Sequence, residues 1–388
     1  MKPIPYGYHS LDPKDIGAVI ETLESDIIAQ GPAIRRLEEA LAAYCRARYA
    51  VCVSSGTSAL HVACLAAGIR RKDEVITSPI TFVASSNCVL YCGGRPVFAD
   101  IQEETVNIDP DEIRKKITAR TSAIIPVHFA GLPCDLARIL ALAKKNDLMV
   151  IEDAAHALGA KYGGSKIGSC RYSDMATFSF HPVKSITTGE GGAITTNSKE
   201  LYERLLMFRN HGITRDRSRF TASGWRSSGP WYYEMQELGF NYRITDFQCA
   251  MGISQLKKLD RFIERRRTIA LRYNRAWRDI EGIRLPAEDR SKGSAWHIYV
   301  IRLVSPALLS KKKTIVDRLR SEGIIANVHY LPVYLHPYYR RILGYKKGLC
   351  PEAERYYEEA LTVPLFPRMT EQDVSFVIKT VRKVFETL

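Results

Sequence analysis

Lys184 has the setting of a residue that forms a covalent bond with a ligand. It lies in FSFHPVKSITTGEGGAITT, residues 178–196, after a strand-like FSF and before a glycine-rich turn that leads into another apolar strand. A lysine amine in a partly desolvated site has a lowered pKa and attacks aldehydes. Ser179 is placed to donate a hydrogen bond to a phosphate, whereas His181 fits a substrate-binding role and simple packing equally well. The segment therefore indicates an aldehyde-bearing ligand held by Lys184.

Asp153 ends an apolar run in VIEDAAHALGA, residues 150–160. Open α/β sheets bind ligands at the carboxyl ends of their strands, and a buried carboxylate there needs a cationic or hydrogen-bonding partner. The N–H of a pyridinium ring is such a partner, although Asp153 alone could equally cap a helix or bind a metal. His156, three residues later, could brace the carboxylate, lie near the ring, or be merely structural.

Two further segments have residue types that hold phosphate. In SSGTSALH, residues 54–61, a strand ends, a glycine permits close approach and hydroxyl side chains open a helix, whose free N–H groups favour an anion. In GFNYRITDFQ, residues 239–248, Asn241 and Arg243 are polar groups in an aromatic turn before a helix. Each segment alone is also typical of an ordinary helix start. Together, the four segments converge on a phosphorylated aromatic heterocycle that bears an aldehyde.

The elements around these segments alternate between strands and helices, which predicts a mostly parallel sheet with crossover helices. Strands are expected at residues 50–55, 74–78, 96–100, 122–129, 148–153, 175–180 and 191–196. Helices are expected at residues 57–67, 82–91 and 133–146. Near-continuous apolar strands of this kind are covered on both faces.

A long helical pattern at residues 245–277 connects this region to a smaller α+β unit. The smaller unit has expected strands at residues 297–303 and 324–330 and expected helices at residues 313–323 and 371–388. A chain of 388 residues is too long for one ordinary core. We therefore expect a large cofactor-binding domain with the N-terminal segment at residues 1–250 and a small C-terminal domain at residues 251–388.

The composition is that of a globular protein. Apolar residues make up 46% of the chain and charged residues 25%. No apolar run approaches the roughly 20 residues that span a bilayer, and the start lacks the apolar segment of a secretory signal, so we expect a cytoplasmic protein. The nine scattered cysteines offer no second close pair to complete a zinc site. We expect them to be small buried thiols, and we expect no metal.

The net charge of +14 is concentrated in the C-terminal part of the chain. Residues 256–388 hold 27 Lys and Arg against 15 Asp and Glu, whereas residues 1–255 hold 29 against 27. This asymmetry is compatible with nucleic acid, a membrane surface or a phosphorylated small molecule as an anionic partner. The basic clusters are short and lie in helix-like stretches, which favours solvated helix faces over a nucleic-acid-binding regulator.

With SSGTSAL, TSPITFVASSN, DAAHALG, SFHPVKSITTGEGG and GFNYRITDFQ in this order, the sequence resembles the DegT/DnrJ/EryC1/StrS family of sugar aminotransferases. The resemblance runs from about residue 5 to the C-terminus. It implies the type I, aspartate-aminotransferase-like fold of pyridoxal-phosphate-dependent transferases, and a homodimer with two active sites at its interface. The implied cofactor is pyridoxal 5'-phosphate (PLP), with pyridoxamine 5'-phosphate (PMP) as its amino form.

The resemblance also implies roles for individual residues. Lys184 looks like the Schiff-base lysine and general acid/base, and Asp153 looks like the partner of the pyridine nitrogen. Phe82 matches the aromatic residue that stacks on the cofactor ring, and His156 stands where many relatives carry glutamine. The positions that match the family's phosphate contacts are Gly56, Thr57, Ser179 and Asn241, the last reaching in from the second subunit. An intact Lys184 favours transamination over the dehydration of family members that have histidine there.

The implied reaction moves an amino group from L-glutamate, which leaves as 2-oxoglutarate, to C4 of a UDP-linked 4-keto-6-deoxy-N-acetylhexosamine. Gln30, His329 and Tyr330 are candidates near the sugar by the same resemblance. The aromatic segment at residues 225–233 either covers the nucleotide or is a mobile surface loop. Another keto sugar nucleotide, 3-keto or TDP-linked, is the main alternative substrate.

Overall fold

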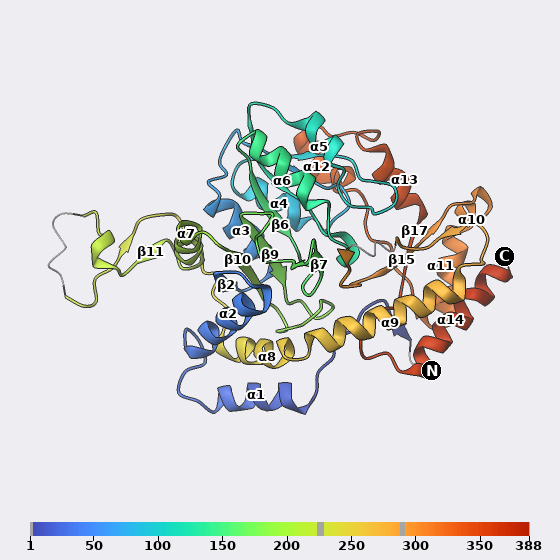
Figure 1. Ribbon diagram of the computed structural model, residues 1–388, viewed down its shortest axis with the longest axis horizontal. Coiled ribbons are helices and arrows are strands. Elements are labelled where there is room, and N and C mark those ends of the chain that lie inside the picture. Colours follow the sequence, from blue (N-terminus) through green and yellow to red (C-terminus); the bar gives the residue numbers. More distant parts are fainter. Residues whose placement is uncertain (1–2, 223–228, 288–291, 388) are drawn as a thin grey trace.

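A seven-stranded sheet lies at the centre of the molecule (Figure 1). The computed structural model describes residues 3–222, 229–287 and 292–387. The strand order is β2-β10-β9-β6-β5-β3-β4, and β10 alone in this sheet runs antiparallel to its neighbours. In that order the strands are Tyr49–Val53, Gly192–Thr196, Met175–Ser179, Met149–Asp153, Thr121–Ile125, Glu74–Thr77 and Arg95–Phe98. The predicted α/β fold with a mostly parallel sheet is confirmed.

Helices cover both faces of the sheet because its strands are apolar on both sides. Along β2, Ala50 and Cys52 face one core while Val51 and Val53 face the other, as the two-residue period of a strand requires. The nine cysteines are free thiols, and eight of them are buried. The helices of this region are α1 Pro13–Leu23, α2 Pro32–Cys45, α3 Gly56–Ala66, α4 Ala84–Tyr91, α5 Pro110–Lys116, α6 Leu136–Lys145, α7 Lys199–Arg209 and α8 Asp246–Leu256, with a short 3-10 turn at Phe129–Gly131.

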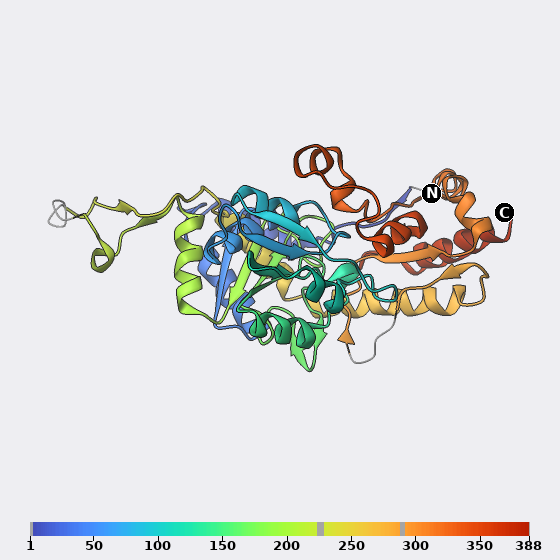
Figure 2. The same ribbon diagram turned by 90° about the horizontal axis from the view of Figure 1, so that it is seen from above.

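Residues 245–277, expected as one helical pattern, form two helices instead. α8 ends at Leu256 and α9 spans Leu259–Trp277. α8 packs against α1 and α2, and Lys258, in the turn between α8 and α9, forms an ion pair with Asp12 at the start of α1 at 3.0 Å. α9 then runs away from the sheet towards the C-terminal part (Figures 1 and 2). The hydrophobic period continues across the turn, so the sequence pattern does not reveal the break.

The C-terminal part has its own sheet and its own core. Its antiparallel strands have the order β13-β15-β17 and pack with α9, α11 and α14 around Tyr273, Trp277 and Tyr299. Its elements are β13 Ile283–Arg284, β14 Lys292–Gly293, β15 Tyr299–Leu303, α10 Pro306–Ser310, α11 Lys312–Ser321, β16 Ile324–Ile325, a 3-10 turn Val333–Leu335, α12 Pro337–Leu343, α13 Pro351–Glu359, β17 Ala360–Val363 and α14 Glu371–Glu386. β14 pairs with the hairpin of β7 Lys161–Tyr162 and β8 Ser165–Lys166.

Two segments link the parts of the chain. The N-terminal strand β1, Ile4–Pro5, pairs in parallel with β16, so the start of the chain packs with the C-terminal part. The strand expected at residues 324–330 is only two residues long, because the backbone after Ile325 leaves β1, bridges to β17 at Asn327 and then brings His329 and Tyr330 to the cavity. The expected domain boundary at residue 250 falls within α8, which packs as a whole on α1 and α2, so we propose the boundary in the turn between α8 and α9, with residues 3–5 packed on the small domain.

A narrow hairpin projects from the large domain (Figures 1 and 2). Its two strands are β11, Ile213–Thr214, and β12, Glu234–Met235, with a short 3-10 turn at Arg217–Arg219 between them. Residues 223–228 lie outside the described part, so the expectation for the aromatic segment at 225–233 concerns described residues only from position 229 onwards.

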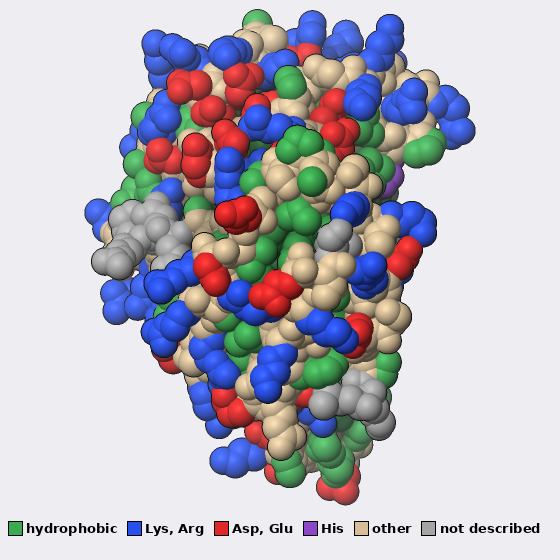
Figure 3. All heavy atoms as spheres, turned by 90° about the vertical axis from the view of Figure 1, so that its right-hand side faces the viewer, with side chains coloured by type: hydrophobic (Ala, Val, Ile, Leu, Met, Phe, Trp, Pro, Cys, Tyr) green, Lys and Arg blue, Asp and Glu red, His purple; other side chains and the backbone are tan. Residues whose placement is uncertain are grey.

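Basic side chains are spread over the end of the molecule that the C-terminal part forms. Figure 3 shows Lys and Arg side chains across this end with Asp and Glu side chains between them. Such mixing is typical of solvated helix faces and does not favour nucleic-acid binding. Among the described residues, no helix combines the length and the apolar character needed to cross a membrane.

Candidate active site

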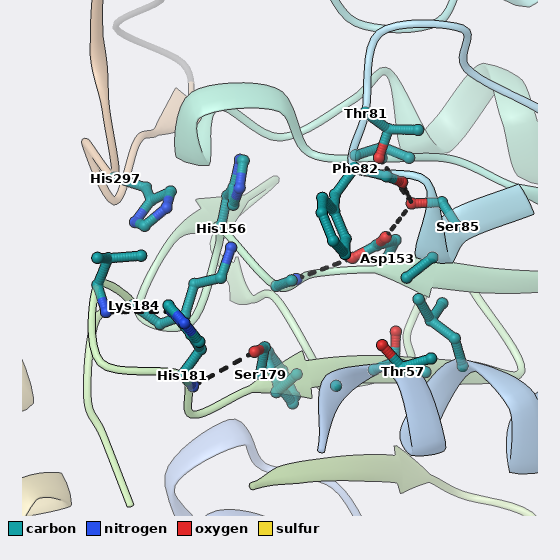
Figure 4. Close-up of a pocket in the computed structure, with 18 of the residues that line it drawn as sticks. Thr57, Thr81, Phe82, Ser85, Asp153, His156, Ser179, His181, Lys184 and His297 are labelled. Atoms are coloured by element: carbon teal, nitrogen blue, oxygen red, sulfur yellow. Dashed lines mark hydrogen bonds between the residues drawn. The ribbon is translucent and has the colours of Figure 1, made fainter. Parts of the chain in front are cut away.

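Most of the predicted site residues surround one cavity of about 470 Å³ at the carboxyl ends of β6 and β9 (Figure 4). The predicted cofactor residues that line it are Gly56, Thr57, Phe82, Asp153, His156, Ser179 and Lys184. The predicted sugar residues that line it are His329 and Tyr330. Gln30 and Asn241 are absent from its described lining.

The start of α3 forms one end of the cavity. Ser55 caps the helix by accepting a hydrogen bond from the N–H of Ser58 at 3.0 Å. A Cβ atom on Gly56 would lie 2.7 Å from Cβ of Ser179, so glycine is needed for the end of β9 to approach the helix this closely. The free N–H groups of the first helical turn and the hydroxyls of Thr57 and Ser179 provide donors for a phosphate.

Asp153 is a buried carboxylate held by neutral donors. Ser85 Oγ donates to its Oδ2 at 2.6 Å, and the N–H of Ala155 donates to its Oδ1 at 3.1 Å. Its exposed fraction is 5%, and no lysine or arginine of the described residues forms an ion pair with it. A pyridinium N–H would supply the missing cationic partner. The ring of Phe82 projects beside Asp153 and is 58% exposed, which leaves an aromatic face free for stacking (Figure 4).

Lys184 lies in a tight loop that follows β9. Its N–H donates to the carbonyl of His181 at 2.9 Å, and Thr188 N–H donates back to the carbonyl of Phe180 at 3.0 Å. Burial lowers the pKa of Lys184 to about 8, while the attraction of Asp153 opposes that shift. A substantial neutral fraction near physiological pH makes this amine a nucleophile for an aldehyde.

A wall of imidazole and phenol rings faces Lys184. Burial, reinforced by the nearby ammonium of Lys184, lowers the pKa of His156 well below its usual value and that of His329 to about 4. Both imidazoles are therefore neutral at physiological pH. His329 Nδ1 lies 2.9 Å from the hydroxyl of Thr362, and the Tyr330 hydroxyl lies 3.4 Å from His156 Nε2. Neutral groups that both donate and accept hydrogen bonds suit uncharged polar ligands.

The two remaining predicted residues lie elsewhere. Asn241 is exposed and forms an isolated antiparallel bridge with Asn210. Gln30 lines a second hollow at the base of the projecting hairpin, together with Arg243, whose Nη1 donates to Asn210 Oδ1 at 2.6 Å. Within a single subunit, neither Asn241 nor Gln30 lines the cavity around Lys184.

Several cavity residues had no role in the sequence analysis, and three of them stand out for their contacts. Ser85 lies within the recognised segment TSPITFVASSN, and only the fold shows that it bonds to Asp153. Tyr6 arrives from the N-terminal segment and packs edge-on against His329, with ring centroids 4.8 Å apart. His297 precedes β15 and reaches the cavity from the small domain. A histidine beside an apolar strand is the only sequence signal for this last contact.

The fold and the cavity together define a PLP-dependent aminotransferase of the type I fold. One cavity is lined by a half-buried lysine in the loop after β9, a buried carboxylate without a cationic partner among the described residues, and a helix start that can hold a phosphate. Residues 9–382 match the DegT/DnrJ/EryC1/StrS aminotransferase family, and the chain belongs to that family.

Individual relatives are similar over nearly their whole lengths. The chain is 43% identical over 371 residues to a protein of Methanocaldococcus jannaschii known as uncharacterized protein MJ1066, covering 96% of this chain and 95% of the relative. It is 36% identical over 386 residues to the UDP-4-amino-4,6-dideoxy-N-acetyl-β-L-altrosamine transaminase of Campylobacter jejuni, covering 99% and 98%. The structure matches Helicobacter pylori PseC, an aminotransferase of pseudaminic acid biosynthesis, with a TM-score of 0.91, 32% identity and full coverage of both chains. The chain is thus a sugar aminotransferase.

The residues of the cavity fit PLP. The Streptococcus pneumoniae protein Spr1654, which has been solved in a PLP form and a PMP form, matches with TM-scores of 0.90 and 0.91, identities of 30% and 31%, and 99% coverage of both chains. When bound, PLP would supply an electron sink for the negative charge that develops on the substrate carbon bearing the amino group. Here Lys184 would hold it covalently, Asp153 would pair with its ring nitrogen, and the start of α3 with Ser179 would bind its phosphate.

Proposed function

We propose that the enzyme transfers the amino group of L-glutamate to C4 of a UDP-linked 4-keto-6-deoxy-N-acetylhexosamine. This is the activity of UDP-4-amino-4,6-dideoxy-N-acetyl-β-L-altrosamine transaminase, which serves pseudaminic acid biosynthesis. The observation that carries the proposal is the neutral wall of His329 and Tyr330 in the cavity that Lys184 also lines. The described lining contains no arginine, and its neutral rings are suited to hydrogen bonds with the hydroxyl and acetamido groups of a sugar.

In this proposal, Lys184 does the proton transfers. Its amine moves a proton to and from the carbon that carries the amino group, first the α-carbon of glutamate and then C4 of the sugar. A positioned general acid/base contributes typically about 10²–10⁴-fold to the rate. Asp153 keeps the cofactor ring nitrogen protonated, and Ser85 holds the Asp153 carboxylate in a fixed orientation.

We also propose that two copies of the chain share their active sites. The projecting hairpin exposes Trp231 by 75% and Met235 by 60%, and Leu238 nearby is 73% exposed, an apolar content that suits a partner surface better than water. Asn241 follows that hairpin and is exposed outside the cavity of its own subunit. In a dimer, this asparagine would complete the phosphate site of the partner, and Gln30 would approach the sugar there.

Product analysis tests the substrate. The enzyme is incubated with ¹⁵N-labelled glutamate and either UDP-linked or TDP-linked keto sugars, and NMR locates the new amine. The proposal expects the label at C4 of the UDP-linked N-acetyl sugar. A label at C3, or turnover restricted to TDP-linked sugars, would instead identify a different keto sugar nucleotide as the substrate.

A further inference from the structure

His297 lines the cavity beside His156, in a tightly constrained place. The two ring centroids lie 4.2 Å apart with their planes tilted by 36°. His297 is 4% exposed, and its Nδ1 is buried without a hydrogen-bond partner among the described residues. Figure 4 shows the two imidazoles side by side above Lys184. The ring of His297 therefore contacts His156 by packing rather than through a hydrogen bond of its own.

The backbone around His297 is held from the large domain. Its N–H donates to the carbonyl of Ala130 at 2.8 Å, and Ala295 N–H donates to the carbonyl of Gly131 at 3.0 Å. Trp296, between them, has a φ of +49°, in the left-handed region that non-glycine residues rarely adopt. Such a conformation persists only where the surroundings impose it, and it is found often at functional sites.

A buried arginine holds the same segment from the other side. Arg266 of α9 is 1% exposed, and its Nη1 donates to the carbonyls of His297 at 3.0 Å and Leu365 at 2.8 Å, with Trp296 at 3.4 Å. No carboxylate of the described residues pairs with it, and burial lowers its pKa to about 10. Burying an uncompensated guanidinium is costly, so these carbonyl bonds are the interactions that offset the cost.

We propose that Arg266 and His297 are positioning residues for the cofactor pocket, with Arg266 fixing the backbone of residues 296–297 and the ring of His297 fixing the ring of His156. Among the described residues, Nδ1 of His156 lacks a hydrogen-bond partner and its Nε2 meets only the Tyr330 hydroxyl at 3.4 Å. Its ring contacts with Tyr330 and Phe129 are longer than that with His297, with centroids 6.3 and 6.4 Å apart. The proposal rests on His156 lining the PLP site, as proposed above, and is independent of which sugar is used.

The affinity of the apoenzyme for PLP tests the link between the two histidines. His297→Ala is expected to raise the dissociation constant roughly three- to tenfold, the loss of one ring–ring contact. His297→Phe, which keeps a ring and loses the nitrogens, is expected to restore most of the affinity. In a His156→Ala background, His297→Ala is expected to have no further effect, because its partner is gone. Equal losses in both backgrounds, or an unchanged affinity of His297→Ala, would overturn the proposal.

Arg266 is tested by the same titration with a matched control. Arg266→Met is expected to weaken PLP binding as much as His297→Ala does. Arg266→Lys is expected to retain part of the affinity that Arg266→Met loses. Arg302 of β15 is also buried, but it pairs with Glu359 and lies outside the cavity lining, so Arg302→Met is expected to lose stability and keep the PLP affinity. Equal weakening by Arg302→Met would make the effect general and refute a positioning role, as would wild-type affinity in Arg266→Met. If Arg266→Met does not fold, the proposal is decided by the PLP affinity of Arg266→Lys and by the comparison of His297→Ala in the wild-type and His156→Ala backgrounds.

Borohydride reduction of the wild-type holoenzyme is carried out first. If no phosphopyridoxyl group were found on Lys184, the proposed cofactor attachment would be contradicted. If the His156→Ala and His297→Ala changes weakened PLP binding additively, only the proposed positioning role of His297 would be contradicted. The two failures are therefore distinguishable.

Discussion

Ser85 Oγ donates a 2.6 Å hydrogen bond to Oδ2 of Asp153, joining the first turn of α4 to the end of β6. Hydrogen bonds to charged groups contribute about 1.5–3 kcal/mol. Removing this one by Ser85→Ala frees the carboxylate that we propose to pair with the cofactor ring. We expect PLP to bind about tenfold more weakly, as measured by titrating the apoenzyme.

Ser86 provides the control for that change. It is the next residue of α4, is equally buried, and bonds to Tyr339 at 2.7 Å instead of to Asp153. Ser86→Ala is expected to lower stability without changing PLP affinity. If the two variants bound PLP alike, Ser85 would have no special role at Asp153.

The lowered pKa of Lys184, about 8 rather than 10.5, predicts a pH dependence. Only the neutral amine attacks an aldehyde, so covalent uptake of PLP by the apoenzyme should accelerate as pH rises through about 8 and then level off. The unfolded chain holds this proton more tightly than the folded one, so the apoprotein should also gain stability between about pH 8 and 10.5. Stopped-flow absorbance measures the first effect and urea unfolding the second. A rate that stays flat across this range would contradict the shifted pKa.

Gly56→Ala tests the close contact between α3 and β9. The added Cβ would lie 2.7 Å from Cβ of Ser179, and overpacking of this kind costs about 1–3 kcal/mol in the free energy of unfolding. Gly17→Ala on α1 meets nothing within 4 Å and should stabilise the protein by about 0.5–1 kcal/mol. Urea denaturation compares the free energies of unfolding of the two variants. If Gly56→Ala were as stable as Gly17→Ala, the close contact with Ser179 would not require glycine at position 56.

His329→Ala separates sugar binding from cofactor chemistry. Its neutral imidazole, bonded to Thr362 at 2.9 Å, is expected to contribute one hydrogen bond to the sugar, worth about 1 kcal/mol. KM for the keto sugar should therefore rise roughly fivefold, while the half-reaction with glutamate keeps its rate. Single-turnover kinetics of each half-reaction measure this. An equal slowing of the glutamate half-reaction would place His329 in the shared chemistry.

Local sequence patterns were enough to predict the central sheet and the site residues that lie close to the ends of its strands. Asp153 ends one apolar strand and Lys184 lies in the loop after another, and the carboxyl ends of neighbouring parallel strands meet at one edge. Gly56 was recognisable for the same reason, because the strand, glycine and hydroxyl residues are contiguous in the sequence. Because the residues of such a motif are contiguous, the local backbone structure sets their relative positions.

Contacts between distant segments could not be predicted in this way. Ser85 and Asp153 are 68 positions apart, and His297 meets His156 only because α9 and the turn at Trp296 bring the small domain back to the cavity. The break at residues 257–258 and the shortened strand after Ile325 have the same origin, since tertiary packing overrides a continuous hydrophobic pattern. The roles of Asn241 and Gln30 depend on a second subunit and stay predictions.

The most direct test of the account is reduction of the PLP-loaded enzyme with sodium borohydride, followed by peptide mapping. We predict a single phosphopyridoxyl group on the peptide that contains Lys184, and we predict that Lys184→Ala is both unlabelled and inactive. A label on another lysine, or steady-state turnover by Lys184→Ala, would contradict it.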